Sequence, residues 1–271
     1  MRAMLFLLLL LCCAALPAAA ETDAEVRAKL LAGHDATVKE VVDGDTVVID
    51  PPVAGAREVR LVGIQAPKLP LGRKNFKPWP KAADSKYALE AMVRGRHVRL
   101  HFGGARMDRH GRHLAHLFLD DGGWVQGNML EAGMARVYTF ADNRAVAEAM
   151  LARERDARGH KRGIWALDFY KPRAAEAAPL MRELGTFQLV EGRVVDAAKV
   201  KGRVFLNFGA NWRDDFTATL APDVVKLARQ EGLDAAGLGG RHVRVRGWLK
   251  SRNGPMIEIT HPEQIELLAD R

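Results

Sequence analysis

Cysteine is almost absent from this 271-residue sequence, and the two that occur, Cys12 and Cys13, are adjacent near the amino terminus. The rest of the chain therefore has no residues for disulfide bonds or thiolate zinc sites, and it depends on packing for stability. Aromatic residues are also few, at 7% of the chain. Beyond residue 20 no apolar run is long enough to cross a bilayer, which excludes an ordinary helical span there.

The first twenty residues have the pattern of a signal peptide. Arg2 forms a short positive region, residues 5–16 are apolar, and three alanines at 18–20 offer a cleavage site. Such a segment is too short and wrongly flanked to be a membrane span. The pattern predicts cleavage after Ala20 and an extracytoplasmic location, periplasmic or secreted.

Positive charge exceeds negative charge, with 41 Lys and Arg against 33 Asp and Glu. A basic exported protein favours polyanionic partners, which include nucleic acid, anionic lipid headgroups and acidic polysaccharide. Charge alone does not choose among these three.

The most informative stretch is residues 38–68. Two β-branched runs within 38–49 flank the sequence DGDT, which is a tight-turn signal. A third strand is predicted at 58–64 and stops before a proline, which cannot donate to a sheet. Consecutive strands usually pair, so Arg60 is expected near Asp43 and Asp45. Carboxylates beside an arginine suit either a metal-assisted phosphate site or a simple ion pair.

Three motifs in order carry a resemblance: DGDTV at 43–47, RLVGIQAP at 60–67 and DRHGR at 108–112. Together they resemble the staphylococcal-nuclease (thermonuclease) family over about residues 36–168. The resemblance implies an OB-type five-stranded β-barrel with packed helices. In that family two aspartates and a backbone carbonyl hold calcium, two arginines hold the scissile phosphate, and a glutamate orients the attacking water.

Part of that site is retained here. By position, the first metal aspartate falls on Asp45, with Asp43 beside it in the turn, and the two arginines fall on Arg60 and Arg112. The resemblance therefore implies Arg60, Arg112 and Asp45 as candidate catalytic residues. Asp45, Asp43 and Gln65 are the candidate metal ligands.

The other part of the site is changed. The second metal aspartate falls on Gln65, the carbonyl donor on Ala66, and the glutamate on Lys68. The two carboxylate replacements make the pocket more positive, and calcium affinity follows the charge of its ligands, so Ca²⁺ is expected to bind far more weakly. Lys68 is expected to pair with Asp45. This predicts a nucleic-acid binder; the alternative is an active DNA or RNA phosphodiesterase that uses a modified site.

Residues 68–81 are rich in proline and basic residues, which predicts an extended loop. The resemblance implies that this loop borders the site. Trp79 is interpreted either as a stacking residue or as the anchor of the loop in the core. The resemblance implies an aromatic ring near the terminal base at 138–140, and core packing is the alternative for Phe140. The candidate substrate contacts are Arg73, Lys74, Lys77 and Tyr138.

Five histidines fall between residues 97 and 116, which suggests a zinc site. His113 and His116 lie on opposite strand faces, and no helical HExxH pattern supports zinc, so surface or phosphate-side positions are predicted. His110 is hypothesised to act as an acid or base next to Arg112.

The second half of the chain predicts a second barrel. Residues 171–185 are rich in alanine and proline and are interpreted as a linker. Three strands, a helix and two strands follow, which is an OB-type order. The predicted ranges are 187–195, 203–208, 216–220, 223–230, 242–249 and 256–260. The fold class is therefore mainly β with packed helices (α+β), organised as a signal peptide at 1–20, a nuclease-like domain at 34–170 and a smaller OB-like domain at 186–269.

One strand of the second barrel carries basic residues and a tryptophan on a single face. These residues are His242, Arg244, Arg246, Trp248 and Lys250. The pattern suits single-stranded nucleic acid or, alternatively, a solvated face with the tryptophan half-buried. A protein partner bound by this domain is a further possibility, and an envelope interaction module is the third function considered.

Overall fold

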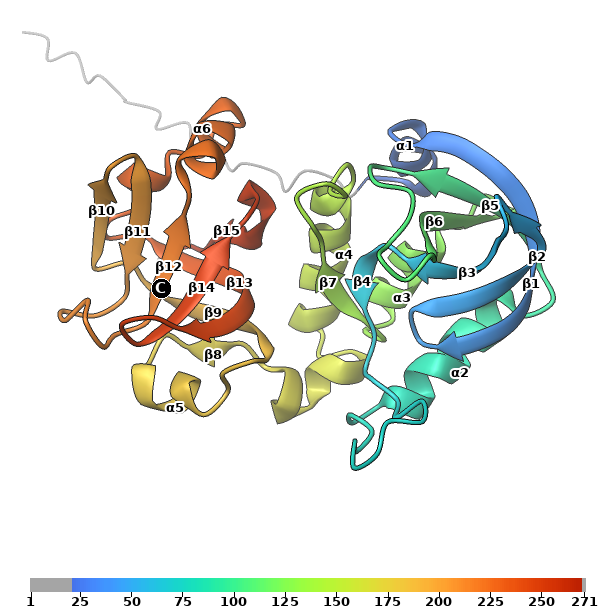
Figure 1. Cartoon of the computed structure of the whole chain (residues 1–271), viewed down its shortest axis with the longest axis horizontal. Helices are drawn as coiled ribbons and strands as arrows, with labels where there is room; N and C mark the ends of the chain where they lie inside the picture. Colours follow the sequence, from blue (N-terminus) through green and yellow to red (C-terminus); the bar gives the residue numbers. More distant parts are fainter. Residues whose placement is uncertain (1–20, 270–271) are drawn as a thin grey trace, which may run out of the picture.

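The computed structural model describes residues 21–269, so the predicted signal peptide lies outside the described residues. Two β-rich bodies lie next to one another, with α4 and β7 of the first facing β13 of the second (Figure 1). No helix within 21–269 combines the length and the apolar character needed to cross a bilayer.

The first body is a closed barrel with the strand order β1-β2-β3-β6-β5. Its strands are β1 Leu31–Asp43, β2 Thr46–Val53, β3 Ala56–Leu61, β5 His97–Phe102 and β6 His113–Leu119. β3 and β6 run parallel, the other neighbours antiparallel, and β1 closes the ring on β5. Alternating apolar residues such as Val47 and Ile49 fill its interior. This confirms the predicted five-stranded barrel.

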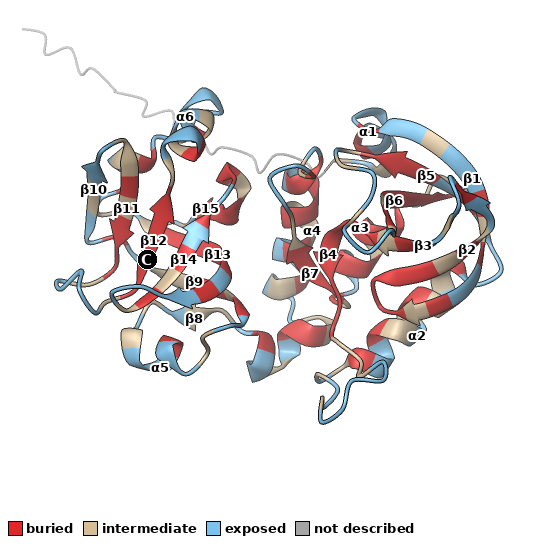
Figure 2. Ribbon diagram, viewed as in Figure 1, coloured by how far each residue is buried: buried red, intermediate tan, exposed pale blue. Residues whose placement is uncertain are grey.

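Helices cover the barrel, and a two-stranded sheet lies beside it. The helices are α1 Asp23–Ala28, α2 Ala82–Val93, α3 Val125–Glu131 and α4 Ala147–Gly159, and the extra strands are β4 Gly63–Gln65 and β7 Arg136–Tyr138. Two short 3₁₀ turns, η1 Gly163–Ala166 and η2 Asp168–Tyr170, then lead to the second body. Figure 2 shows β7 and much of α4 as buried.

The second body is one curled sheet in the order β10-β11-β12-β14-β13-β9-β8, with β15 paired to β13. Its strands are β8 Arg173–Ala174, β9 Phe187–Arg193, β10 Asp196–Val200, β11 Arg203–Asn207, β12 Thr217–Leu220, β13 His242–Ser251, β14 Pro255–Ile259 and β15 Ile265–Leu267. Its helices are α5 Ala177–Met181, α6 Pro222–Gln230, η3 Ala235–Gly237 and η4 Pro262–Gln264. Only two residues separate β9 from β10, which lie far apart in the strand order, so the sheet must curl back on itself.

Three strands of this body were not predicted, namely β8, β10 and β15. The predicted linker at 171–185 also needs correction, because β8 pairs with β9 and Leu180 of α5 is fully buried in the second core. The apolar residues of this segment are mostly alanine, and they show no periodicity from which this packing could be predicted.

The basic face of β13 is a second correction. Arg244 and Arg246 are buried, with Arg246 at 1% exposure, and therefore cannot form an open nucleic-acid surface. Arg246 instead donates to Glu154 of α4 and to Glu266 of β15, both at 2.6 Å. The face packs against the first body because these carboxylates compensate its charge.

The histidines also differ from expectation, since His101, His113 and His116 are buried. A ring nitrogen of His113 lies 2.7 Å from the carbonyl of Val53, and Trp124 donates to His116 at 3.3 Å. Burial lowers the pKa of His116 to about 3, so this ring is neutral near pH 7. These histidines are core residues.

Candidate functional site

The hairpin between β1 and β2 brings two aspartates to one end of the first barrel. Asp43 ends β1 and pairs with Thr46, so the DGDT turn forms as predicted. The amide of Asp45 donates to Asp43 Oδ1 at 3.1 Å, a local bond typical of aspartate in turns. Gly44 is needed because a Cβ there would collide with Oγ of Ser85 at the start of α2. The turn is therefore packed against α2, and both of its aspartates are buried.

The carboxylate of Asp45 is the centre of a charged cluster. Its Oδ2 accepts from Lys68 Nζ at 2.9 Å and from the Ala66 amide at 2.7 Å, and it lies 3.2 Å from Arg60 Nη2. Burial by itself would raise the pKa of Asp45, but the charges of Arg60 and Lys68 outweigh it and lower the pKa to about 2. Burial and the charge of Asp45 raise the pKa of Asp43. The predicted pairing of Lys68 with Asp45 is present.

Arg60 is turned into this cluster. Its Nη1 donates to the carbonyls of Asp45 at 3.1 Å and Leu61 at 2.6 Å, and its Nη2 donates to the carbonyl of Ile64 at 2.6 Å. The side chain is 13% exposed. The resemblance implies that the guanidinium of Arg60 binds phosphate. In the structure both terminal nitrogens of this guanidinium donate instead to backbone carbonyls.

Gln65 points to a buried arginine that the sequence analysis missed. Its Oε1 accepts from Arg136 Nε at 2.9 Å and Nη2 at 2.7 Å, because β4 and β7 pair the two residues directly. The guanidinium carbon of Arg136 lies 4.9 Å from the Phe187 ring centroid and 5.7 Å from that of Trp79. Burial lowers the pKa of Arg136 to about 10. The amide oxygen that was predicted as a weak metal ligand is thus engaged by a cation.

Arg112 is held by its own turn. Oδ1 of Asp108 accepts the amides of His110 at 2.8 Å and Arg112 at 3.0 Å, and Oδ2 accepts Arg112 Nε at 2.8 Å. Arg60 pairs with Leu114, two residues beyond Arg112, so the two arginines are separated by about 7 Å of strand. The Arg112 side chain is 28% exposed, and His110 is exposed. Both remain accessible to a ligand at this edge of the barrel.

The basic loop at 68–81 runs beside the junction of the two bodies (Figure 1). Arg73, Lys74 and Lys77 are exposed, although Arg73 folds back on Phe76 with 3.8 Å between its guanidinium carbon and the ring centroid. Trp79 is partly buried in a small core between the bodies, and its amide donates to the Lys68 carbonyl at 2.9 Å. Trp79 is therefore the anchor of the loop, and the two lysines are its accessible cations.

Tyr138 is less open than the sequence analysis expected. Its ring centroid lies 4.9 Å from Phe140 and 4.9 Å from Phe187, and its hydroxyl accepts from Trp248 Nε1 at 2.9 Å. The second body thus covers much of this ring. Phe140 is 46% exposed, so core packing does not describe its position.

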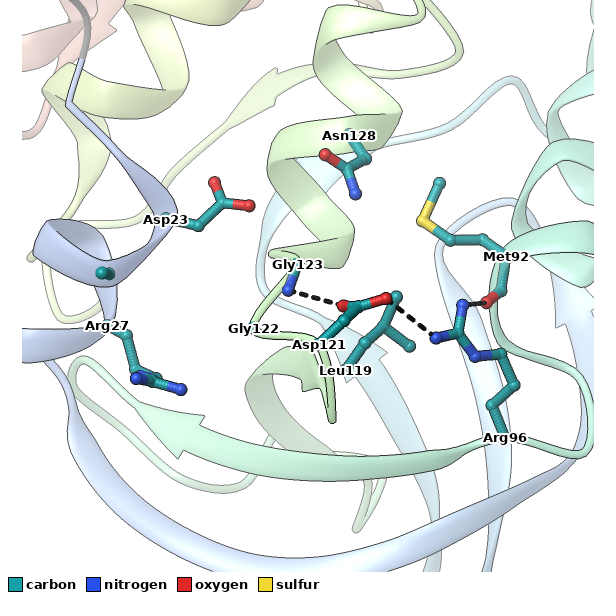
Figure 3. A pocket seen from close by; sticks show the side chains of 10 residues that line it. Asp23, Arg27, Met92, Arg96, Leu119, Asp121, Gly122, Gly123 and Asn128 are labelled. Carbon is teal, nitrogen blue, oxygen red and sulfur yellow. Dashed lines mark hydrogen bonds and ion pairs between the residues drawn. The ribbon is translucent and has the colours of Figure 1, made fainter.

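A cavity of about 710 Å³ lies away from these residues (Figure 3). It is lined by Asp23, Arg27, Met92, Arg96 and Asp121 together with neighbouring residues. Met92 of this lining lies seven residues after Ser85, which contacts the aspartate turn at Gly44. Seven helical residues correspond to about 10 Å along α2, so the cavity is separate from the Asp45 cluster. Arg96 donates to Asp121 at 3.1 Å in this cavity, so its charge is already compensated.

Within residues 21–269 no three His, Cys, Asp or Glu side chains are grouped to hold a metal ion.

Replacing Asp45 by asparagine is expected to destabilise the protein by about 2 kcal/mol at pH 7, because Arg60 and Lys68 lower the pKa of Asp45 to about 2 and this stabilisation of the charged form is lost. Urea denaturation measures the change. Asp50→Asn is the control, since its pairs with Lys39 and Arg57 are exposed and contribute little. Equal stability of the two variants would contradict the importance of the Asp45 cluster.

Comparison with known proteins places this chain in a family. The family model for staphylococcal nuclease homologues matches residues 58–167. A thermonuclease of Staphylococcus intermedius is 29% identical over 133 residues, which are 49% of this chain and 77% of that protein. An uncharacterized endonuclease of Escherichia coli is 30% identical over 129 residues, which are 48% of this chain and 75% of that protein.

A prophage-derived endonuclease of Bacillus subtilis (strain 168) is 29% identical over 138 residues, or 50% of this chain. This chain covers only 45% of that protein. Each similarity thus spans about half of the chain.

Proposed function

The chain belongs to the staphylococcal nuclease homologues, and from this membership we propose that it binds the phosphodiester backbone of nucleic acid without needing calcium. The observation that carries the proposal is the Lys68 ammonium, 2.9 Å from the buried carboxylate of Asp45. An internal cation thus neutralises the acid from which the family builds its metal site. Lys74, Lys77 and Arg112 are accessible and are the proposed phosphate contacts.

The donor set does not fit a calcium ion. Asp45 Oδ2 has Lys68, Arg60 and the Ala66 amide around it, and Gln65 Oε1 accepts two bonds from Arg136. Calcium requires six to eight oxygen ligands, and affinity rises with their negative charge. We therefore assign no step to a metal. Lys68 is a poor general base while it is protonated and paired with Asp45.

The second candidate function is hydrolysis of DNA or RNA. It is favoured by the retained pair Asp43 and Asp45 and by both arginines at this barrel edge. The printed names of the related thermonuclease and endonucleases point the same way for those proteins. For this chain hydrolysis would require Lys68 to leave Asp45.

We also propose that the predicted signal peptide exports the chain, so that it binds nucleic acid outside the cytoplasm.

Binding to a labelled single-stranded oligonucleotide in the presence of EDTA tests the proposal. With the three proposed phosphate contacts the affinity should fall about twentyfold between about 50 and about 200 mM salt. A Lys74→Ala/Lys77→Ala variant should lower the slope of log K against log salt by about 1.4. Fluorescence anisotropy measures both. Affinity that does not change with salt would refute binding through phosphates.

The Asp45→Asn variant separates the two functions. If the protein is a binder, loss of this carboxylate releases Lys68 toward phosphate, while backbone carbonyls still hold Arg60, so oligonucleotide affinity should be retained or increased. If the protein is a calcium-dependent nuclease, the same change should abolish cleavage of the oligonucleotide. Gel analysis with and without Ca²⁺ distinguishes these outcomes.

A further inference from the structure

Four aromatic side chains from both bodies meet beside the candidate site: Tyr138, Phe140, Phe187 and Trp248. Tyr138 is central, with ring centroids 4.9 Å from Phe140, 4.9 Å from Phe187 and 6.5 Å from Trp248. All three contacts are edge-to-face, the geometry that aromatic pairs prefer when they pack. The cluster is therefore well ordered by its own contacts and includes residues from β7, β9 and β13.

Strand pairing links this cluster to the charged site. Tyr138 lies opposite Gly63, and two residues away Arg136 lies opposite Gln65. Arg136 then contacts Phe187 on the second body and Trp79, the anchor of the basic loop. The cluster, the loop and the Asp45 site thus share one region of the molecule.

Two members of the cluster leave much of their surface open. Phe140 is 46% exposed and Trp248 is 44% exposed. Trp248 has its polar atom satisfied, because Nε1 donates to the Tyr138 hydroxyl at 2.9 Å. The exposed part of this ring is therefore apolar, and the hydrogen bond fixes its orientation. Of the predicted basic face of β13, Trp248 remains open where Arg244 and Arg246 are buried.

We propose that Trp248 extends onto the second body the aromatic site that the family resemblance implies at 138–140, so that Phe140 and Trp248 together form a base-stacking platform for single-stranded nucleic acid. The inference rests on the proposed function. The occupant is argued from charge, since the loop that carries the exposed Lys74 and Lys77 is anchored at the same junction by Trp79, which packs in one cluster with Tyr138 and Phe187. A single strand exposes base faces to aromatic rings, whereas the bases of a duplex are already stacked on one another.

The test compares oligonucleotide binding by Trp248→Ala and Trp212→Ala. Trp212 is a matched control, because it is 52% exposed and belongs to the segment between β11 and β12, at the far side of the second body in Figure 1. Trp248→Ala should weaken binding of a single-stranded oligonucleotide about tenfold, since one base–aromatic contact is lost. Trp212→Ala should bind as the unchanged protein does. Trp248→Phe should recover most of the affinity, and duplex binding should be unaltered.

Phe140→Ala provides a second variant that leaves the interface residue Trp248 in place. It should also weaken single-strand binding several-fold, with no change in duplex binding. Normal single-strand affinity in both Trp248→Ala and Phe140→Ala would overturn the platform while leaving the proposed function intact. Failure of the unchanged protein to bind any oligonucleotide would instead overturn the proposed function, and the platform with it.

Discussion

The double variant Gln65→Asp/Lys68→Glu should bind calcium at least a hundredfold more tightly than the unchanged chain. The substitutions make the pocket more negative and remove the ammonium that lies 2.9 Å from Asp45. One unit charge at about 4 Å is worth about 4 kcal/mol at an effective dielectric constant near 20. A hundredfold gain needs about 2.8 kcal/mol, so even strongly screened charges suffice. Isothermal titration calorimetry measures the change.

The single variants should contribute unequally. Gln65→Asp on its own should give little calcium binding, because the new carboxylate would pair with the buried Arg136 that now donates twice to the amide oxygen. Lys68→Glu should give most of the gain, since it both removes a cation and adds a carboxylate next to Asp43 and Asp45.

Lys74→Glu is the matched control for Lys68→Glu, because it makes the same change in net charge on an exposed loop. Its calcium affinity should stay that of the unchanged chain. If the unchanged chain binds calcium as tightly as the double variant, the displacement of the metal by Lys68 is wrong. No gain in the double variant would show that geometry, rather than charge, limits the site.

The turn could be predicted because its signal is local. The DGDT sequence lies between two β-branched runs, which indicates a tight turn joining two strands. The barrel and the pairing of Lys68 with Asp45 followed instead from the family resemblance, which supplied the arrangement of distant parts of the chain.

The surroundings of Gln65 could not be predicted, because Arg136 is 71 residues away in sequence. Nothing in the local pattern of either residue indicates that β4 and β7 form a separate two-stranded sheet. The bonds of Arg60 to three backbone carbonyls were missed for a similar reason. They depend on how the strand end curls, which is a property of the folded backbone.

The face of β13 shows a different limit. Its alternation was read correctly as basic residues on one side and apolar residues on the other. The sequence did not indicate which residues cover the basic side of β13, since Glu154 belongs to a helix of the other body, 92 residues earlier. Burial of an arginine is rare unless a carboxylate accompanies it, so an exposed face was the natural expectation.

Arg246→Met is expected to destabilise the protein by about 3–5 kcal/mol, because it leaves buried carboxylates without their main partner. Glu154 would keep only Arg158, at 3.8 Å, whereas Glu266 would keep Arg244 at 3.2 Å and Arg158 at 3.6 Å. Glu154 is fully buried, so most of the cost should arise there. Urea denaturation measures the loss, with the exposed Arg252→Met as the control.

The double variant Arg246→Met/Glu154→Met should be more stable than Arg246→Met alone, since it removes the uncompensated charge together with its partner.

The same ion-pair network predicts that the stability of the protein falls in acid. Burial would raise the pKa of Glu266, but Arg246 and its neighbours lower it to about 2. Its folded pKa thus lies below the unfolded value, so its stabilisation is present above about pH 4.5 and is lost as pH falls toward about 2.

That acid sensitivity should be smaller in the Arg246→Met variant, because less of the lowered pKa of Glu266 remains. Since Arg246 and Glu154 belong to different bodies, the variant should also uncouple them, with two unfolding transitions replacing one in calorimetry. A single transition with unchanged stability would mean that apolar contacts such as Phe187 with Tyr138 hold the bodies together without the ion pairs. The stacking platform requires the two bodies to remain in contact. It therefore depends on whichever interaction stabilises the junction, the Arg246 ion pairs or the packing of Phe187 on Tyr138.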